Sequence, residues 1–222
     1  MKQIFIIGLL LIVMLVAGCS GTVDSTGTED EDLQMSVYVD GEVGTQDNGD
    51  ETMTVAKFET SMGTFELELF TESMPITTGN FIKLANEKYF DGTRFHRVIA
   101  SFMIQGGDPQ SADTSKRSRW GTGGPGYSIK DEHVAGAELT NARGTISMAN
   151  SGPQSGGSQF FINVVDNTFL DWDKQPSSSK HPVFGKVVSG MDVVDAISTT
   201  PVGRGDQPVE DVIVNSVVIE ER

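Results

Sequence analysis

Three segments of the chain combine polar side chains with aromatic ones, and they are the places where chemistry could occur. They are FHRVIASFMIQGGD (residues 95–108), GTISMANSGPQSGGSQFFI (residues 144–162) and SKHPVFGKVVSGMDVVDAI (residues 179–197). Arg97, in the first segment, stays charged at any relevant pH and offers a rigid fork of N–H donors. In isolation, such an arginine is usually a surface residue paired with a carboxylate, and nearby Phe, Met and Leu side chains are core residues by default.

Several other chemistries find no support in the residue types. The three histidines lie far apart and Cys19 is the single cysteine, so no metal set emerges and no internal disulfide can form. No nucleophile elbow or Ser-His-acid arrangement points to a hydrolase. The formal net charge of −15 argues against nucleic acid as a partner, because phosphate binding needs a basic surface.

All three segments resemble, in residue types and order, the motifs of the cyclophilins, which are peptidyl-prolyl cis/trans isomerases. The resemblance extends from Met53 to Arg222, about three quarters of the chain. It implies an enzyme that needs no cofactor or metal and acts on proline-containing unfolded or folding polypeptides. The alternative is a cyclophilin-like module that binds such segments with little turnover, and comparison with an Arg97→Ala variant separates the two.

Rotation about an X–Pro bond faces a barrier of about 18–20 kcal/mol and takes tens to hundreds of seconds unaided. In the twisted transition state the proline nitrogen regains its lone pair. A catalyst therefore needs a dry pocket for the ring, a donor for that nitrogen and polar groups that hold the preceding carbonyl. The resemblance makes Arg97 the donor, and a bond to a lone pair that exists only in the twisted state binds the transition state selectively.

The resemblance implies a catalytic set and a substrate-binding set. The catalytic set is Arg97, Gln105 near the substrate carbonyl, and Asn150, whose backbone groups pair with the substrate backbone. The substrate-binding set is His96, Phe102, Met103, Ala149, Ser151, Gln159, Phe161, Phe169, Leu170 and His181, of which Phe102, Met103, Phe161 and Leu170 form the proline pocket. Strand alternation sends Phe160 and Phe161 to opposite faces, which favours Phe161 as the pocket residue.

Some positions depart from the family pattern. Phe169 stands where eukaryotic members carry tryptophan, and it lacks the indole N–H donor. We therefore expect weak cyclosporin A binding with isomerase activity retained. Ser151 replaces a common alanine. The loops 110–120 and 173–179 are enlarged, and the first carries a basic cluster that is either a solvated loop or a contact for acidic partners or a membrane surface: Lys116, Arg117 and Arg119.

The elements that must position these residues are short. Alternation over 55–59 and 64–68 predicts two half-buried strands joined by a turn at 61–63. Pro75 begins a predicted helix that extends through Asn86, and residues 191–197 form a second. Short β-rich runs predict six further strands, at 94–98, 102–105, 145–148, 159–164, 183–188 and 212–219. This pattern predicts a mainly β fold, a closed antiparallel barrel capped by two helices, to which the resemblance assigns eight strands.

The N-terminal residues predict export and attachment. Lys2 precedes an apolar run over residues 4–17, which describes a signal peptide over residues 1–18, and LVAGC resembles the lipobox of prokaryotic lipoproteins. The resemblance implies lipidation of Cys19; the alternative is an ordinary signal peptide or uncleaved anchor with an incidental cysteine. Residues 19–52, rich in acidic residues, predict a disordered tether. We expect residues 53–222 to form a monomeric isomerase domain, lipid-anchored on the extracytoplasmic face of the cell membrane.

Overall fold

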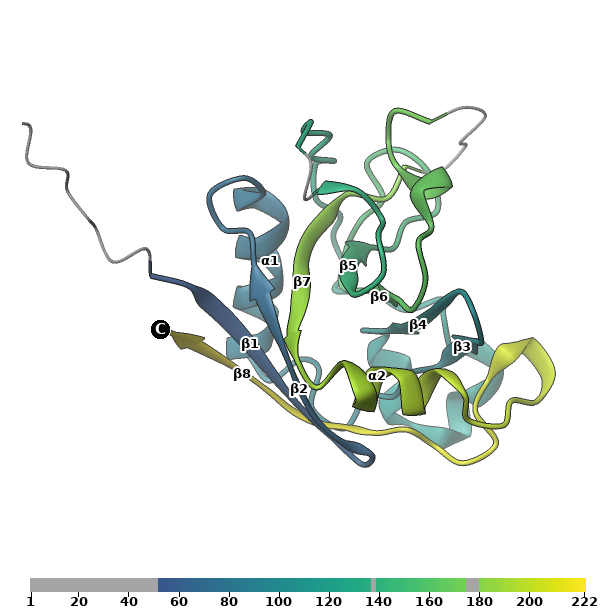
Figure 1. Cartoon of the computed structure of the whole chain (residues 1–222). Coiled ribbons are helices and arrows are strands. Elements are labelled where there is room, and N and C mark those ends of the chain that lie inside the picture. The colour runs from purple at the N-terminus through teal and green to yellow at the C-terminus, as the bar shows by residue number, and fades with distance from the viewer. Residues whose placement is uncertain (1–51, 137–138, 175–179) are drawn as a thin grey trace, which may run out of the picture. The chain divides into compact units, whose positions relative to one another are not determined.

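Eight strands form one antiparallel sheet in the computed structural model, which describes residues 52–136, 139–174 and 180–222. The strands are β1 (Thr54–Thr60), β2 (Gly63–Leu69), β3 (Arg97–Ile99), β4 (Met103–Gly106), β5 (Thr145–Met148), β6 (Phe160–Asn163), β7 (Val183–Ser189) and β8 (Val214–Glu221). Their order is β3-β4-β6-β5-β7-β2-β1-β8, and the sheet curls round into a half-barrel (Figure 1). The predicted mainly β fold of eight antiparallel strands is confirmed.

The prediction of a closed barrel is wrong, because no continuous ladder joins the edge strands β3 and β8. The chain ahead of β3 meets the start of β8 only over a short stretch. It does so through the isolated bridge Arg94–Ile213 and through three backbone bonds, Gly92 N–H to Val214 O at 2.8 Å, Val214 N–H to Thr93 O at 2.8 Å and Phe95 N–H to Val212 O at 3.0 Å. β3 has only three residues and begins at Arg97, beyond that contact. The strand is too short to extend the bridge into a ladder, so the sheet stays open.

The other edge of the curl brings the two ends of the domain together. β1 pairs with β8 over its whole length, from Thr54 opposite Glu221 to Thr60 opposite Val214. Beyond the strands, the Met53 N–H donates to Arg222 O at 2.6 Å, and the Arg222 N–H donates to Met53 O at 3.0 Å. The first and last residues of the folded domain are therefore backbone neighbours, as Figure 1 also shows.

Within the residues that the structure describes, two α-helices accompany the sheet, as predicted. In α1 (Pro75–Asn86), Pro75 occupies the first turn, where its missing N–H costs nothing. Met74 at the N-cap makes no side-chain cap bond. The buried Glu132 carboxylate supplies that cap from a distant loop, accepting from the Ile76 N–H at 2.9 Å and the Thr77 N–H at 2.6 Å. The cap fixes the start of the helix against the domain.

The second helix, α2 (Met191–Ser198), follows β7 directly and runs along the lower rim of the sheet (Figure 1). Its N-cap, Gly190, has a left-handed backbone with φ 76°. A Cβ at this position would lie 2.5 Å from the backbone oxygen of Thr64, so both conformation and space require glycine here.

Phenylalanine rings fill the core between the sheet and α1. Phe160 of β6 lies at the centre, edge-on to four rings whose centroids are 5.7–6.4 Å away: Phe58, Phe81, Phe90 and Phe95. Its own side chain is 1% exposed. Edge-to-face packing of this kind is favourable beyond the area that it buries, so Phe160 joins the sheet to the helix.

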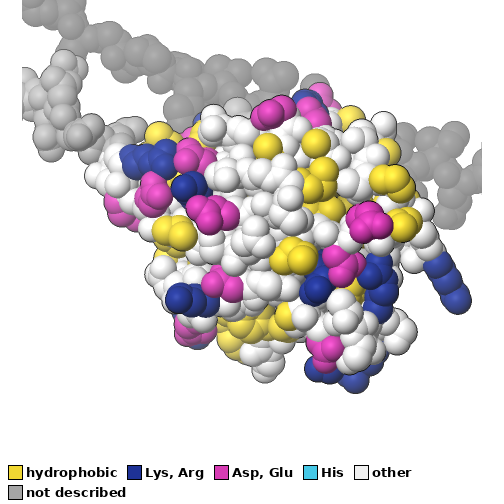
Figure 2. Space-filling model, turned by 90° about the horizontal axis from the view of Figure 1, so that it is seen from below, with side chains coloured by type: hydrophobic (Ala, Val, Ile, Leu, Met, Phe, Trp, Pro, Cys, Tyr) yellow, Lys and Arg dark blue, Asp and Glu magenta, His cyan; other side chains and the backbone are white. Residues whose placement is uncertain are grey.

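The enlarged loop after β4 is ordered into two short 3₁₀ segments, η1 (Pro109–Ala112) and η2 (Thr114–Arg119). Two members of its basic cluster pair with carboxylates of the same chain, Lys116 with Asp113 at 3.2 Å and Arg117 with Asp211 at 2.7 Å. On the face shown in Figure 2, basic and acidic side chains are interspersed. Most of the other enlarged loop, residues 175–179, lies outside the described residues.

No helix in the described ranges is long and apolar enough to cross a membrane. Those same residues contain no group of His, Cys, Asp and Glu side chains able to hold a metal ion. The predicted signal peptide, Cys19 and nearly all of the tether lie outside the part of the chain that the structure describes.

Candidate active site

A cavity of about 240 Å³ opens on one face of β3, β4 and β6. Its lining residues are Arg97, Phe102, Met103, Gln105, Ala149, Asn150, Phe161, Leu170 and His181. All nine belong to the catalytic and substrate-binding sets predicted from the sequence. The structure therefore brings residues from three separate segments of the chain, and from the short 3₁₀ segment η4 (Thr168–Leu170), to one place.

The strand register explains why these residues meet. Arg97 of β3 lies opposite Gln105 of β4, which lies opposite Phe161 of β6. Residues directly opposite one another in neighbouring strands share a face of the sheet, so the three line up across the cavity. The alternate residues Ile104 and Ile162 pair on the other face and are fully buried in the core.

The floor of the cavity is apolar and nearly dry. Met103 and Phe161 are only 2% and 5% exposed. The Phe161 ring meets the His181 ring edge to face, with centroids 5.2 Å apart. Phe169 does not line the cavity: its side chain is 62% exposed and its ring stacks against Phe102 with centroids 6.1 Å apart. It therefore extends the apolar surface outward from the rim.

Polar groups surround this floor and are fixed by bonds among themselves. The Gln105 side-chain amide donates to Gln159 Oε1 at 3.0 Å, and the Gln159 amide donates to Gly123 O at 2.8 Å. The Asn150 amide donates to Lys180 O at 2.7 Å, so its side chain is engaged within the protein. That engagement holds the Asn150 backbone in place, and backbone groups are what the resemblance assigns to substrate contact.

A second hollow of about 480 Å³ adjoins the first, and the two share Gln105, Ala149 and Asn150. It takes in two more predicted residues, Ser151 and Gln159. Together the hollows form a groove with one apolar end beside Arg97 and one polar end, a shape suited to a short extended peptide.

Comparison with known proteins agrees with this geometry. Residues 55–219 match the family described as cyclophilin type peptidyl-prolyl cis-trans isomerase/CLD. The chain belongs to the cyclophilin family. It is 43% identical over 164 residues to peptidyl-prolyl cis-trans isomerase-like 1 of Neurospora crassa, an alignment covering 73% of this chain and 93% of the relative. Peptidyl-prolyl cis-trans isomerase B of Streptomyces anulatus is 40% identical over 185 residues, covering 75% of this chain and 97% of that relative.

Solved cyclophilins have the same fold. A crystal structure of a Cryptosporidium parvum cyclophilin type peptidyl-prolyl cis-trans isomerase, obtained in the presence of the dipeptide Ala-Pro, matches with a TM-score of 0.64 and 28% identity. The match covers 76% of this chain and 99% of that one. The chain matches peptidyl-prolyl cis-trans isomerases over nearly the full lengths of those relatives. This cyclophilin is therefore an enzyme of the peptidyl-prolyl cis-trans isomerase class.

His96 takes a different place in the cyclophilin domain from the groove. Its side chain is 3% exposed and it lines neither hollow. Both ring nitrogens are buried without a hydrogen-bond partner among the described residues. Burial lowers the pKa of His96 to about 4, because a charged imidazole would lose its hydration there. A packing role for the neutral ring fits this placement, and direct substrate contact does not.

Titration of His96 should make the cyclophilin domain less stable in mild acid. The unfolded chain binds this proton near pH 6.5 and the folded domain only near pH 4, so the free energy of unfolding falls as the pH drops through that window. At pH 5 the expected loss is about 2 kcal/mol relative to pH 8. Urea titrations at several pH values, compared with those of His96→Gln, measure it. Parallel pH curves for the two proteins would contradict the prediction.

The other two histidines differ from His96. The His181 ring, at the cavity wall, has Nδ1 3.0 Å from Met148 O, and burial lowers its pKa. The ring is therefore neutral near pH 7, with Nδ1–H donating to the carbonyl. His133 is exposed and stacks on Trp172, with ring centroids 5.7 Å apart.

Phe169 allows a direct test of cyclosporin sensitivity. The native domain should bind cyclosporin A weakly, and Phe169→Trp should bind it about two- to tenfold more tightly, the value of one hydrogen bond from the added indole N–H. The exposed ring gives tryptophan room at this position. Inhibition of isomerase activity measures both affinities. Nanomolar inhibition of the native domain, or no gain in Phe169→Trp, contradicts this interpretation.

Behind the cavity lies a buried polar network that sequence reasoning missed. The Asn167 amide donates to Phe102 O at 2.8 Å. The fully buried Asn141 amide donates to Asp171 Oδ1 at 2.9 Å and to His181 O at 3.2 Å. These bonds fix the backbone of two cavity residues from behind. The network also includes Asn163, which is fully buried and whose Oδ1 accepts from the Asn167 amide at 2.8 Å. This residue was the available signal, an asparagine at the end of the otherwise apolar strand sequence FFIN, because a buried amide requires partners.

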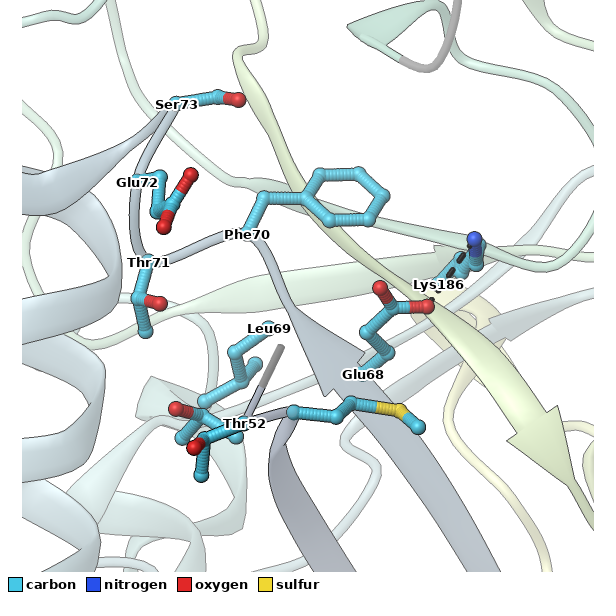
Figure 3. A pocket seen from close by; sticks show the side chains of 10 residues that line it. Thr52, Glu68, Leu69, Phe70, Thr71, Glu72, Ser73 and Lys186 are labelled. Atoms are coloured by element: carbon cyan, nitrogen blue, oxygen red, sulfur yellow. Dashed lines mark ion pairs between the residues drawn. The ribbon is translucent and has the colours of Figure 1, made fainter. Parts of the chain in front are cut away.

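A separate hollow of about 370 Å³ lies where β1 begins and β2 ends, beside Lys186 of β7 (Figure 3). Glu68 and Lys186 face one another there, with Oε2 and Nζ 3.0 Å apart, and the Lys186 ammonium lies 5.7 Å from the centre of the Phe70 ring. This hollow contains none of the residues predicted for catalysis or substrate binding.

Proposed function

We propose that this cyclophilin accelerates X–Pro isomerisation in exported polypeptides and so assists their folding. The observation that carries the proposal is the placement of Arg97 at the edge of a dry apolar cavity formed by Phe102, Met103, Phe161 and Leu170. The crystal structure of the Cryptosporidium relative was obtained in the presence of Ala-Pro, which supports proline-containing segments as the ligand class.

In the proposed mechanism, the proline ring enters the apolar cavity and loses its water. The Asn150 backbone and the polar end of the groove hold the chain on the N-terminal side, and Gln105 lies near the preceding carbonyl. As the amide twists, its nitrogen becomes pyramidal and Arg97 donates to the exposed lone pair. No bond is made to the enzyme, so the rate gain comes from electrostatic stabilisation of the twisted amide.

The activity is tested with a peptide containing Ala-Pro, by NMR exchange spectroscopy on the purified protein. If the protein catalyses exchange, a substoichiometric amount of it should broaden the cis and trans signals of the peptide or produce exchange peaks between them. Peptide binding without faster exchange would instead support the binding-module alternative.

We also propose that Cys19 is lipidated and that the domain acts as a monomer on the outer face of the cell membrane. The support is the sequence pattern alone, a short apolar run that ends in LVAGC ahead of an acidic segment. Two or more acyl chains would hold the protein firmly, since each buried methylene contributes about 0.8 kcal/mol.

Replacing Cys19 should abolish lipid attachment to the protein. Full-length Cys19→Ser is expected to incorporate no labelled palmitate, whereas the native protein should carry the label into the detergent phase of a detergent partition. The label is the readout, because the substitution leaves the apolar run intact and an unprocessed chain would stay in the membrane without lipid. Native protein without label, or Cys19→Ser that still incorporates it, contradicts lipidation of Cys19.

A further inference from the structure

Arg97 is held by a carboxylate to which no motif of the sequence points. Its Nε–H donates to Asp206 Oδ2 at 3.4 Å, and the two groups form an ion pair. Their side chains are 43% and 46% exposed. Within the described part of the chain, the two Nη groups of Arg97 make no further hydrogen bond. The carboxylate thus occupies the inner donor of the guanidinium and leaves the outer donors for a ligand.

Asp206 is presented by a tight turn in the loop between α2 and β8, within the 3₁₀ segment η5 (Arg204–Asp206). Gly205 and Asp206 both have left-handed backbone, with φ values of 73° and 58°. Aspartate tolerates this conformation better than most residues. The Gly203 N–H donates to Gln207 O at 2.8 Å and closes the turn. The carboxylate is therefore fixed by local backbone geometry.

Arg117, in the enlarged loop 110–120, stabilises the segment that follows this turn. Arg117 donates to Asp211 Oδ1 at 2.7 Å and to the backbone oxygen of Pro208. In return, the Gln207 amide donates to Arg117 O at 3.1 Å. A residue expected in a solvated loop or a partner contact thus braces the segment that carries Asp206.

We propose that Asp206 is a positioning residue for the isomerase reaction. It fixes the Arg97 guanidinium so that the Nη donors face the proline nitrogen before the substrate arrives. This rests on the proposed function. A free arginine side chain samples many rotamers, and restricting them beforehand removes an ordering cost from the transition state. Because partly exposed pairs are weak, the expected effect is about threefold on kcat.

The experiment compares three variants of the full chain. Asp206→Asn keeps the size and removes the charge, and Asp206→Glu restores a carboxylate. Glu210→Gln is the matched control, because it removes an exposed carboxylate from the same loop and has no bond to Arg97. For each, kcat and KM are measured by NMR exchange with an Ala-Pro peptide, and the Arg97 Nε–Hε resonance is recorded.

Asp206→Asn is expected to lower kcat about threefold, to change KM less, and to shift and broaden the Arg97 Nε–Hε signal. Asp206→Glu should recover part of both effects, and Glu210→Gln should match the native protein. An unshifted Arg97 signal in Asp206→Asn, or a kcat equal to or above that of the control, overturns the positioning role. Native protein that does not accelerate exchange above the uncatalysed rate is a separate result, which refutes the proposed function itself.

Discussion

Arg97→Ala is expected to lower kcat/KM for an Ala-Pro peptide by about 10²–10³-fold, the usual cost of removing one donor that stabilises charge in a transition state. The loss should fall mainly on kcat, because the apolar floor of Met103 and Phe161 remains to bind the proline ring. The Arg97 side chain is 43% exposed, so its removal opens no buried cavity and the domain should stay folded.

Two variants make the result specific. Arg97→Lys keeps the charge but loses the planar fork of donors, so it should recover only a small part of the activity. Arg119→Ala removes an exposed arginine from the loop 110–120 and should behave like the native protein. Exchange spectroscopy gives the rates, and thermal unfolding checks the fold. If Arg97→Ala accelerates isomerisation as well as the native protein does, the assigned role of this residue is wrong.

Phe160→Ala should cause the largest loss of stability, about 3–5 kcal/mol. Phe160 is surrounded by four rings and is 1% exposed, so truncation leaves a cavity between the sheet and α1 that rigid neighbours cannot fill. A domain of this size typically has about 5–15 kcal/mol of stability in total. The midpoint of thermal unfolding should therefore fall by roughly 10 °C.

The neighbouring residue is the control. Phe161 points into the cavity, so Phe161→Ala should unfold at a temperature closer to that of the native protein while losing much of its activity. Urea denaturation and peptide exchange measured on both variants test this pair. A larger stability loss in Phe161→Ala than in Phe160→Ala would mean that the two faces of β6 have been assigned the wrong way round.

Features determined by local sequence were predictable. Pro75 and the apolar spacing that follows it identified α1 with correct ends, since the first-turn proline and the buried face are encoded within twelve residues. The side on which Phe160 and Phe161 lie follows from strand alternation. The nine cavity residues followed from long motifs whose order resembles the family, and periodicity alone would not have separated them from core residues.

Features that depend on distant contacts were not predictable. The sheet would close only if the isolated bridge between Arg94 and Ile213 continued as a ladder of paired residues. These two residues are more than a hundred positions apart, and nothing in the local sequence shows that β3 has only three residues. Asp206 forms its ion pair with Arg97 because a turn with two left-handed residues places its carboxylate beside the guanidinium. His96, which the resemblance assigned to substrate binding, lies just ahead of β3 and is buried away from both hollows.

The antiparallel pairing of β1 with β8 has a topological consequence. Because the backbones of Met53 and Arg222 bond to each other, a short glycine-serine linker could join them with little loss of chain entropy. The exposed hairpin turn at Ser61 and Met62 could then supply new ends. Such a circular permutant should retain the groove, and cargo fused after Arg222 in the native order would emerge beside the point where the N-terminal segment enters the domain.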